Sequence, residues 1–302
     1  MDKAQLFKEI NRLKKEKNAV ILAHYYQEGS IQDIADYTGD SLYLSQIAAE
    51  TDAEIIVFAG VHFMAETAKI LSPTKKVLLP VSLAGCPMAE MVTETRLIAY
   101  KKKHPDRKVI CYVNSTAKVK ALSDICVTSS NAEKIIKHFV NDKLLYVPDK
   151  NLGIYMREKY NLDMDVWPGF CCIHNDLTTD QVAEQRKNYP NAEFIVHPEA
   201  KLEVVKLADF IGSTKGLLEY TIKSDTQEFI VGTEDGILHT MQKASPNKKF
   251  HILSPGLRCY DMKLTTLNDV YLALKEEQFE IDVPEDIREK AFQALDKMLK
   301  LS

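Results

Sequence analysis

Three of the six cysteines in this chain recur at nearly constant spacing. Cys86, Cys171 and Cys259 are 85 and 88 residues apart, and each follows a glycine by one to three positions. Three thiolates form a soft ligand set that suits zinc or an iron–sulfur cluster. Because three protein ligands leave one metal position open for water or substrate, such sites are typically catalytic rather than structural. The spacing therefore predicts a three-thiolate metal centre that does chemistry.

We expect different roles for the other three cysteines. Cys111 and Cys126 each fall inside an apolar run, which is typical of buried structural thiols. Cys172 adjoins Cys171 and could replace it as a ligand. None of the six forms a Cys-x-x-Cys pair, so zinc ribbons, thioredoxin-like redox sites and ferredoxin-type motifs have no support.

A second recurring set of residues carries hydroxyl groups. Ser41, Ser129 and Ser213 stand in Ser/Thr turns 88 and 84 residues apart, each where a helix is expected to begin. Ser and Thr commonly cap helices, but helix N-termini also bind anions through their free N–H groups. Three such turns around one centre would hold a polyanionic small molecule.

The first strand of each repeat is expected to end in groups that can transfer protons. These groups are His24, Tyr25 and Tyr26, then Tyr112, Val113, Asn114 and Ser115, then His197, Pro198 and Glu199. Imidazole, phenol and carboxylate are the usual acid–base groups of enzymes. Their recurrence at one register favours a catalytic role over a purely structural one. His174, three residues after Cys171, could serve the substrate or the surroundings of the metal.

Short apolar runs must position these groups. They cover residues 19–23, 54–59, 77–79, 109–113, 144–147, 164–167, 194–196, 229–231 and 250–253. Runs this short, rich in Val and Ile and without alternation, predict buried parallel strands in βαβ units. Ligands bind outside the carboxyl ends of such strands. The succession of strand, hydroxyl turn, strand and cysteine occurs three times, which predicts three related α/β units facing a common centre.

Linkers that carry charge and a proline divide these units. We expect one αβα domain at residues 1–104, a second at 105–190 and a third at 191–265, with residues 266–302 completing the first. That last segment predicts a helix over 267–275, a strand over 279–281 and a helix over 285–299.

Composition excludes several classes of protein. The 302 residues are 45% hydrophobic and 27% charged, as in an average soluble domain. The formal net charge is −4, which argues against a nucleic-acid partner. The longest apolar run, residues 55–61, is too short to span a membrane, and the first 17 residues lack the apolar region of a secretory signal. We expect a cytoplasmic protein with reduced thiols.

Together these motifs resemble quinolinate synthase, the iron–sulfur enzyme family of bacterial and archaeal NAD biosynthesis. The matching segments, in order, are AHYYQ (23–27), DIADYTGDS (33–41), FMAETAKIL (63–71), CPMA (86–89), YVNST (112–116), TSSNA (128–132), PDKNL (148–152), HPE (197–199), GST (212–214), GTE (232–234) and CxxMK (259–263).

The resemblance implies a fold, a reaction and a set of site residues. The fold would be three homologous three-layer αβα domains with short parallel sheets, in a pseudo-threefold arrangement around a central cluster. The reaction would condense iminoaspartate, supplied by an L-aspartate oxidase or dehydrogenase, with dihydroxyacetone phosphate to give quinolinate, phosphate and water. Cys86, Cys171 and Cys259 would hold a 4Fe–4S cluster whose fourth iron is open.

The other residues that the resemblance implies fall into two groups. Substrate-binding positions would be His24, Ser41, Tyr112, Val113, Asn114, Ser129, His174, His197, Pro198, Glu199, Ser213 and Thr214. Catalytic proton transfers would involve Tyr26 and Glu199, with His24 and His197.

Two departures from the family pattern affect the site. Tyr25 stands where the family often has Asn, and Phe170 and Cys172 flank the second cysteine, where the family commonly has Gly-His-Cys-x-x-His. Two alternatives stay open: a non-enzymatic iron–sulfur sensor or carrier on the same scaffold, and a three-thiolate zinc hydrolase.

Overall fold

The computed structural model describes residues 1–302 and repeats one succession of strands and helices three times. The first unit contains α1 (Lys3–Glu16), β1 (Ala19–His24), α2 (Gly29–Ile34), β2 (Tyr37–Gly39), α3 (Ser41–Glu50), β3 (Ile55–Ala59), α4 (His62–Leu71), β4 (Lys76–Leu78), α5 (Pro87–Glu90) and α6 (Glu94–Lys103). The second contains β5 (Lys108–Tyr112), α7 (Ala117–Ala121), β6 (Ile125–Val127), α8 (Ala132–Ile136), the 3₁₀ helix η1 (Lys137–Phe139), β7 (Leu144–Val147), α9 (Lys150–Tyr160), β8 (Met164–Val166), α10 (Cys172–Asn175) and α11 (Thr179–Asn188). The third contains β9 (Glu193–Val196), α12 (Leu202–Val205), β10 (Phe210–Ile211), α13 (Thr214–Lys223), β11 (Glu228–Gly232), α14 (Ile237–Ala244), β12 (Lys249–Ile252) and α15 (Tyr260–Lys263). Two further helices follow, α16 (Leu267–Glu276) and α17 (Glu285–Leu301).

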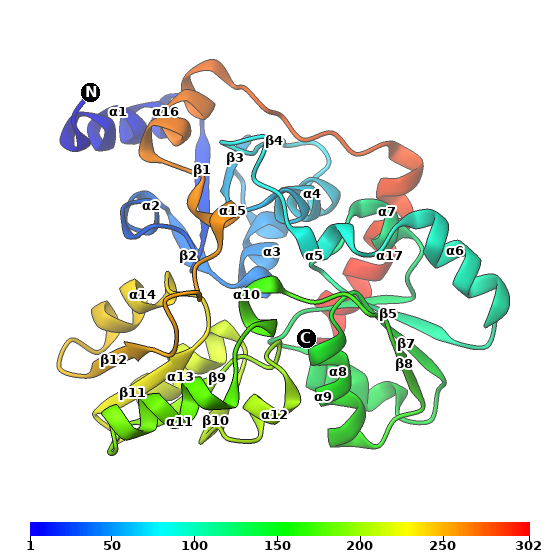
Figure 1. Ribbon diagram of the computed structural model, residues 1–302. Helices are drawn as coiled ribbons and strands as arrows, with labels where there is room; N and C mark the ends of the chain where they lie inside the picture. Colours follow the sequence, from blue (N-terminus) through cyan, green and yellow to red (C-terminus); the bar gives the residue numbers. More distant parts are fainter.

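Each unit forms one four-stranded parallel sheet, and the strand order is the same in all three. The orders are β2-β1-β3-β4, β6-β5-β7-β8 and β10-β9-β11-β12. In Figure 1 the first sheet lies in the upper part of the molecule, the second on the right and the third at the lower left. The predicted α/β class is confirmed, whereas the pseudo-threefold relation and the domain boundaries stay predictions.

An aspartate completes the hydrogen bonding of the central strand in every sheet. The edge strands β2, β6 and β10 are only two or three residues long, so the central strand has an N–H group beyond the end of each ladder. A carboxylate oxygen 15 residues further along accepts that N–H. The bonds join Ile21 to Asp36 (2.8 Å), Val109 to Asp124 (2.7 Å) and Phe194 to Asp209 (2.7 Å).

Helices cover the sheets because the central strands are apolar on both faces. All five residues of β3 are buried. On one side of the first sheet, Leu6, Ile10 and Leu13 of α1 join Val270 and Leu274 of α16 in a single buried cluster with β1 and β3. The first unit therefore uses α16 as part of its helical layer.

The last helix covers a different unit. Buried Ala291, Ala294, Leu295 and Met298 form one face of α17, which packs against α7 and β6 of the second unit and also contacts α4. This placement differs from the expectation that all of residues 266–302 complete the first domain. The physical reason is that α7 has only five residues and leaves much of that face of the second sheet for α17 to cover.

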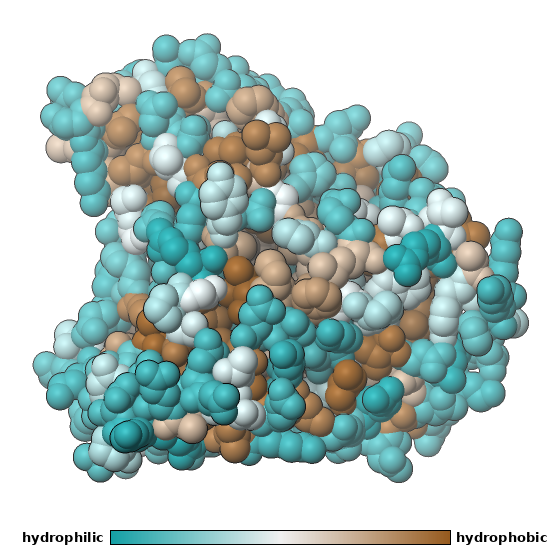
Figure 2. Space-filling view, viewed as in Figure 1, coloured by the Kyte–Doolittle hydropathy of each residue, from teal (hydrophilic) through white to brown (hydrophobic).

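Between these two helices the chain runs beside the first sheet. Glu280 forms a single antiparallel bridge with Leu78, so the strand predicted over 279–281 is reduced to one bridge. The surface in Figure 2 is mostly hydrophilic at the periphery, and hydrophobic residues gather toward the centre of this face. No helix of the chain combines the length and the apolar character needed to cross a membrane.

Candidate active site

The ends of the central strands and the three cysteine turns meet at a cavity of about 330 Å³. This volume is within the range of small-molecule sites. The sequence-predicted residues that line it are His24, Tyr26, Ser41, Cys86, Tyr112, Asn114, Ser129, Cys171, His174, His197, Glu199, Thr214 and Cys259. Residues separated by more than 200 positions in the sequence thus share one cavity.

A few predicted residues lie elsewhere. Val113, Pro198 and Ser213 are buried but do not line the cavity. Cys111 and Cys126 are fully buried partners on neighbouring strands β5 and β6. Cys172 lines the cavity and is exposed to solvent.

Each of the three recurring cysteines occupies the same local structure. Cys86, Cys171 and Cys259 are the N-cap residues of the four-residue helices α5, α10 and α15. None of their side chains accepts a capping hydrogen bond from the usual N–H of the first turn. Their thiols therefore do not cap these helices, and that of Cys171 lies 3.3 Å from His174 Nδ1.

The thiols also interact with one another. Burial raises the pKa of Cys86 to about 12, and the neighbouring Cys259 adds to the rise. Burial likewise raises the pKa of Cys259 to about 11, and burial, Glu199 and Cys86 raise that of Cys171 well above its usual value. A bound metal would reverse this preference because a coordinated thiol loses its proton.

The charges around the cavity also fit a metal. The acidic lining residues are Asp40, Glu199, Glu234 and Asp261, and the only lysine or arginine among the lining residues is Arg258. The donor atoms of Cys171, His174 and Glu199 lie within 4.8 Å of one another and could hold a metal ion. A cation bound among these groups would offset the excess of acidic and thiol groups.

A chain of hydrogen bonds crosses the cavity wall from Tyr26 to Glu199. The Tyr26 hydroxyl lies 2.7 Å from the Thr233 hydroxyl, which lies 2.9 Å from His174 Nε2. His174 Nδ1 lies 2.7 Å from Glu199 Oε2. Because an ionised carboxylate only accepts, the imidazole donates from Nδ1 and accepts from Thr233 at Nε2. The chain therefore has one direction, from the phenol to the carboxylate.

Glu199 keeps its charge in this buried position. Burial opposes ionisation, but the imidazole of His197 and a hydrogen bond from His174 lower the pKa of Glu199 to about 2. The ring centroids of the two histidines lie 4.9 Å apart in a stacked arrangement. The carboxylate is therefore ionised at neutral pH and accepts the hydrogen bond from His174.

His24 and His197 share one arrangement at the ends of β1 and β9. His24 Nδ1 accepts the backbone N–H of Tyr26 at 3.1 Å, and His197 Nδ1 accepts that of Glu199 at 3.3 Å. Burial lowers the pKa of His24 to about 3 and that of His197 to about 4. Both imidazoles are therefore neutral and carry their proton on Nε2, where it can be donated to a ligand.

The second unit contributes groups whose hydrogen-bonding capacity is not used within the protein. Asn114 Oδ1 is buried without a hydrogen-bond partner and belongs to a residue that lines the cavity. An unpaired buried acceptor is costly unless a ligand satisfies it. Burial, with Glu199, raises the pKa of Tyr112 well above its usual value, so its phenol stays protonated beside the carboxylate.

The three hydroxyl turns meet directly. The Ser130 hydroxyl donates to the carboxylate of Asp40 and lies 2.7 Å from the Ser213 hydroxyl. Ser41 and Thr214 follow as the first residues of α3 and α13. As predicted, these turns stand at helix starts, and Asp40 and Ser213 are the capping residues. Ser130 thus links turns from all three units.

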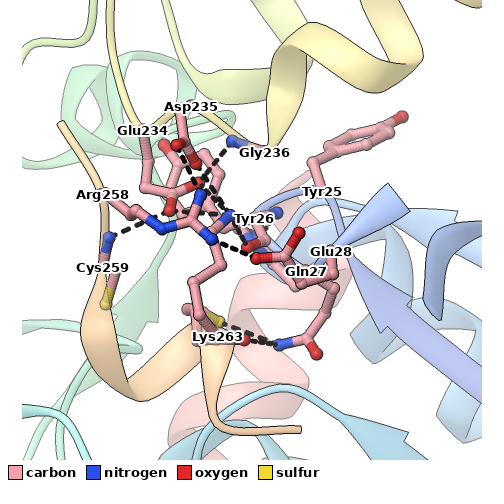
Figure 3. Close-up of polar contacts among 12 residues, drawn as sticks. Tyr25, Tyr26, Gln27, Glu28, Glu234, Asp235, Gly236, Arg258, Cys259 and Lys263 are labelled. Atoms are coloured by element: carbon pink, nitrogen blue, oxygen red, sulfur yellow. Dashed lines mark hydrogen bonds and ion pairs between the residues drawn. The ribbon is translucent and has the colours of Figure 1, made fainter. Parts of the chain in front are cut away.

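Sequence reasoning missed several residues that hold the site. Thr233 completes the chain from Tyr26 to His174, and two buried carboxylates accept the N–H groups of cysteines: Asp149 from Cys171 (3.1 Å) and Glu234 from Cys259 (3.0 Å). Figure 3 shows Glu234 together with Cys259. All three follow the second long strand of a unit, β7 or β11, whereas the predicted acid–base groups follow the first strand of each unit. The same inspection of β7 and β11 would have found them.

Comparisons with known proteins agree with this geometry. A family model described as quinolinate synthetase A protein matches residues 8–300. A quinolinate synthase of Alkaliphilus metalliredigens is 52% identical over 302 residues, which are the whole of both chains. One from Caldicellulosiruptor saccharolyticus is 50% identical over the whole of both chains. Quinolinate synthase 2 of Methanosarcina acetivorans is 46% identical over all of this chain and 97% of that protein.

Proposed function

The chain belongs to the quinolinate synthetase A family, and we propose that it joins iminoaspartate to dihydroxyacetone phosphate, releasing phosphate and water to form quinolinate. Family membership itself makes the chain an enzyme of quinolinate synthesis in NAD biosynthesis. The non-enzymatic sensor considered from the sequence is therefore set aside. Because iminoaspartate hydrolyses readily as an imine, we infer that an L-aspartate oxidase or dehydrogenase supplies it nearby.

The metal in this proposal is a 4Fe–4S cluster held by Cys86, Cys171 and Cys259. The proposal is supported by the three equivalent N-cap positions around one cavity and by the soft character of thiolate donors. When bound, such a cluster with one open iron supplies a Lewis acid for a hydroxyl or carboxylate oxygen of the substrate.

The hydroxyl turns and the imidazoles bind the substrates' anionic groups. Ser41, Ser129 and Thr214 offer hydroxyl groups from three units at one cavity. His24 and His197 offer Nε2–H donors beside them. These two histidines therefore orient oxygen atoms, which departs from the sequence-based expectation that they move protons.

Proton transfer is carried out by Tyr26 and Glu199, the two ends of the hydrogen-bond chain. Tyr26 holds a proton that can pass through Thr233 to His174 Nε2, while Glu199 accepts the proton of Nδ1. Tyr26 is thus placed to remove a proton from the substrate while its own proton passes through Thr233 to His174, and the proton that leaves His174 Nδ1 neutralises the buried carboxylate of Glu199. The amide of Asn114 lies free to position a substrate group.

One observation carries the proposal: the three recurring cysteines line the same cavity as the chain from Tyr26 to Glu199. Metal donors and acid–base groups that share one small cavity are what a condensation with loss of water requires.

The first experiment is metal analysis of protein purified without oxygen. We expect about four iron and four sulfide per chain, lost when Cys86, Cys171 or Cys259 is changed to Ala. Changing Cys111 or Cys172 to Ser serves as the matched control and should leave the iron in place. Zinc in place of iron would overturn the proposed cluster, and loss of iron on changing Cys172 would reassign the second ligand.

The second experiment measures quinolinate formed from dihydroxyacetone phosphate and enzymatically generated iminoaspartate. The Glu199→Gln variant should keep its iron and sulfide but lose turnover, because an amide cannot take up the proton. Undiminished activity of this variant would remove Glu199 from the proton path.

A further inference from the structure

A buried ion pair beside the turn that carries Cys259 also contacts the first unit. Lys263, in the helix that follows Cys259, places its Nζ 2.9 Å from Glu234 Oε1 and 2.9 Å from Asp235 Oδ1. The side chains of Lys263 and Glu234 are only 9% and 1% exposed. Exposed ion pairs contribute little to structure, so the depth of this one sets it apart from those on the surface.

The side chains of Lys263 and Glu234 also bind the backbone of Tyr26 and of Cys259. Lys263 Nζ donates to the backbone carbonyl of Tyr26 at 2.6 Å. Glu234 Oε1 accepts the backbone N–H of Cys259 at 3.0 Å. A continuous path therefore runs from the third cysteine through Glu234 and Lys263 to the tyrosine of the first unit. Figure 3 shows these residues converging from the segment of Cys259, from the end of β11 and from the end of β1.

The surroundings leave this arrangement little freedom. A Cβ atom at Gly236 would lie 2.7 Å from Lys263 Nζ and 2.7 Å from the Cα of Tyr26. Gln27 of the first unit donates to the carbonyl of Met262 at 2.7 Å. Lys263 is thus enclosed by backbone on two sides, and its ammonium group donates hydrogen bonds to the carbonyl of Tyr26 and to the carboxylate of Glu234.

We propose that Glu234 and Lys263 are positioning residues, which together form a clamp that fixes the Cys259 turn against Tyr26. The clamp holds the third thiol and the phenol at one spacing, although they come from opposite ends of the chain. This inference rests on the proposed role of Cys259 as a metal ligand. The neighbouring ion pair of Lys243 with Asp33, at 2.7 Å, also joins α14 to α2 but is exposed, and it provides a matched control.

The test measures how fast iodoacetamide alkylates each cysteine in metal-free, reduced protein, with the modified peptides counted by mass spectrometry. We expect Cys259 to react at least ten times faster in Lys263→Met than in the parent protein, with Cys86 unchanged. Lys243→Met should match the parent protein at both cysteines. Alkylation of Cys259 at the parent rate in a folded Lys263→Met variant would overturn the proposal, as would equal acceleration at Cys86.

A double variant distinguishes a positioning role of the pair from mere neutralisation of the Glu234 charge. It also provides a test if Lys263→Met does not fold. E234Q/K263M leaves no unpaired buried charge, so it avoids the penalty of a broken buried pair. We expect Cys259 to stay at least ten times more reactive in the double variant. Protection restored to the parent level would mean that the pair only balances charge, which would overturn the clamp.

A second measurement uses the iron-loaded protein. Release of iron to a chelator should be several times faster in E234Q/K263M than in the Lys243→Met control, and equal rates would contradict the clamp. If the parent protein binds no iron at all, the proposed cluster fails, but the alkylation rates still decide whether the clamp exists. The two failures are therefore distinguishable.

Discussion

The Tyr26 hydroxyl lies 2.7 Å from the Thr233 hydroxyl, although the two residues are 207 positions apart. Thr233 has no ionisable group, yet it connects a phenol in the first unit to an imidazole in the second. Its hydroxyl can accept from Tyr26 and donate to His174 Nε2 at the same time. The connection between Tyr26 and the pair of His174 and Glu199 depends on this one residue.

Replacing Thr233 with Val should therefore interrupt proton transfer without changing the shape of the site. We expect kcat to fall about 100-fold, the lower range for loss of an acid–base contribution. Steady-state quinolinate formation gives the rate, and iron content shows that the metal site is intact. Thr233→Ser, which keeps the hydroxyl, should retain most of the activity; a Ser variant as slow as the Val variant would speak against the relay.

Ser130 offers a test of the junction between the hydroxyl turns. Ser130→Ala removes the link between Asp40 and Ser213, so Ser41 and Thr214 should lose their relative position. We expect the KM for dihydroxyacetone phosphate to rise about fivefold, equivalent to the loss of one hydrogen bond, with a smaller change in kcat. Ser123→Ala is the control because that hydroxyl donates to the carbonyl of Val119 and does not line the cavity. An unchanged KM would show that the turns hold their places independently.

His24 predicts a specific dependence of stability on pH. Burial lowers its pKa to about 3 in the folded protein, so the unfolded chain binds the extra proton between about pH 6.5 and pH 3. Stability from this group is therefore complete above about pH 6.5 and falls as pH decreases through that window, by at most about 1.4 kcal/mol per pH unit. His24→Asn should flatten the slope in urea titrations of metal-free protein between about pH 6.5 and pH 4.5. Parallel slopes for the two proteins would contradict this interpretation.

The three aspartates that accept a strand N–H are expected to stabilise the fold. Changing Asp36, Asp124 or Asp209 to Ala leaves a strand N–H without its acceptor. We expect each change to lower the free energy of unfolding by about 1–3 kcal/mol, measured by urea denaturation. Asp225→Ala, whose side chain accepts none of these bonds, is the control. A loss no greater than the control's at all three positions would mean that water replaces the carboxylates.

Much of this fold was predictable because its strands are buried on both faces. Nine strands lie within one residue of their predicted bounds, since runs such as residues 144–147 are apolar throughout and end at Pro or Gly. The recurrence of Cys86, Cys171 and Cys259 also predicted three thiols at one centre, and all three line one cavity. In both cases a local pattern, repeated three times, carried the information.

What escaped prediction depends on contacts between units. The edge strands β2 and β10 are too short to leave a pattern. Thr233 and Glu234 gain their roles only from partners in other parts of the chain, Tyr26 and Lys263. The packing position of α17 could not be predicted either, because the sequence of an amphipathic helix indicates which face is buried but not which sheet that face covers.

The placement of α17 has a consequence for synthesis of the chain. This helix covers α7 and β6, which are made on the order of 170 residues before it. At roughly 5–20 residues per second, that face of the second sheet waits about ten to thirty seconds on the ribosome before its cover emerges. During this interval the nascent second unit presents apolar surface of the kind that chaperones recognise, while the third unit, which needs no late helix, can already close.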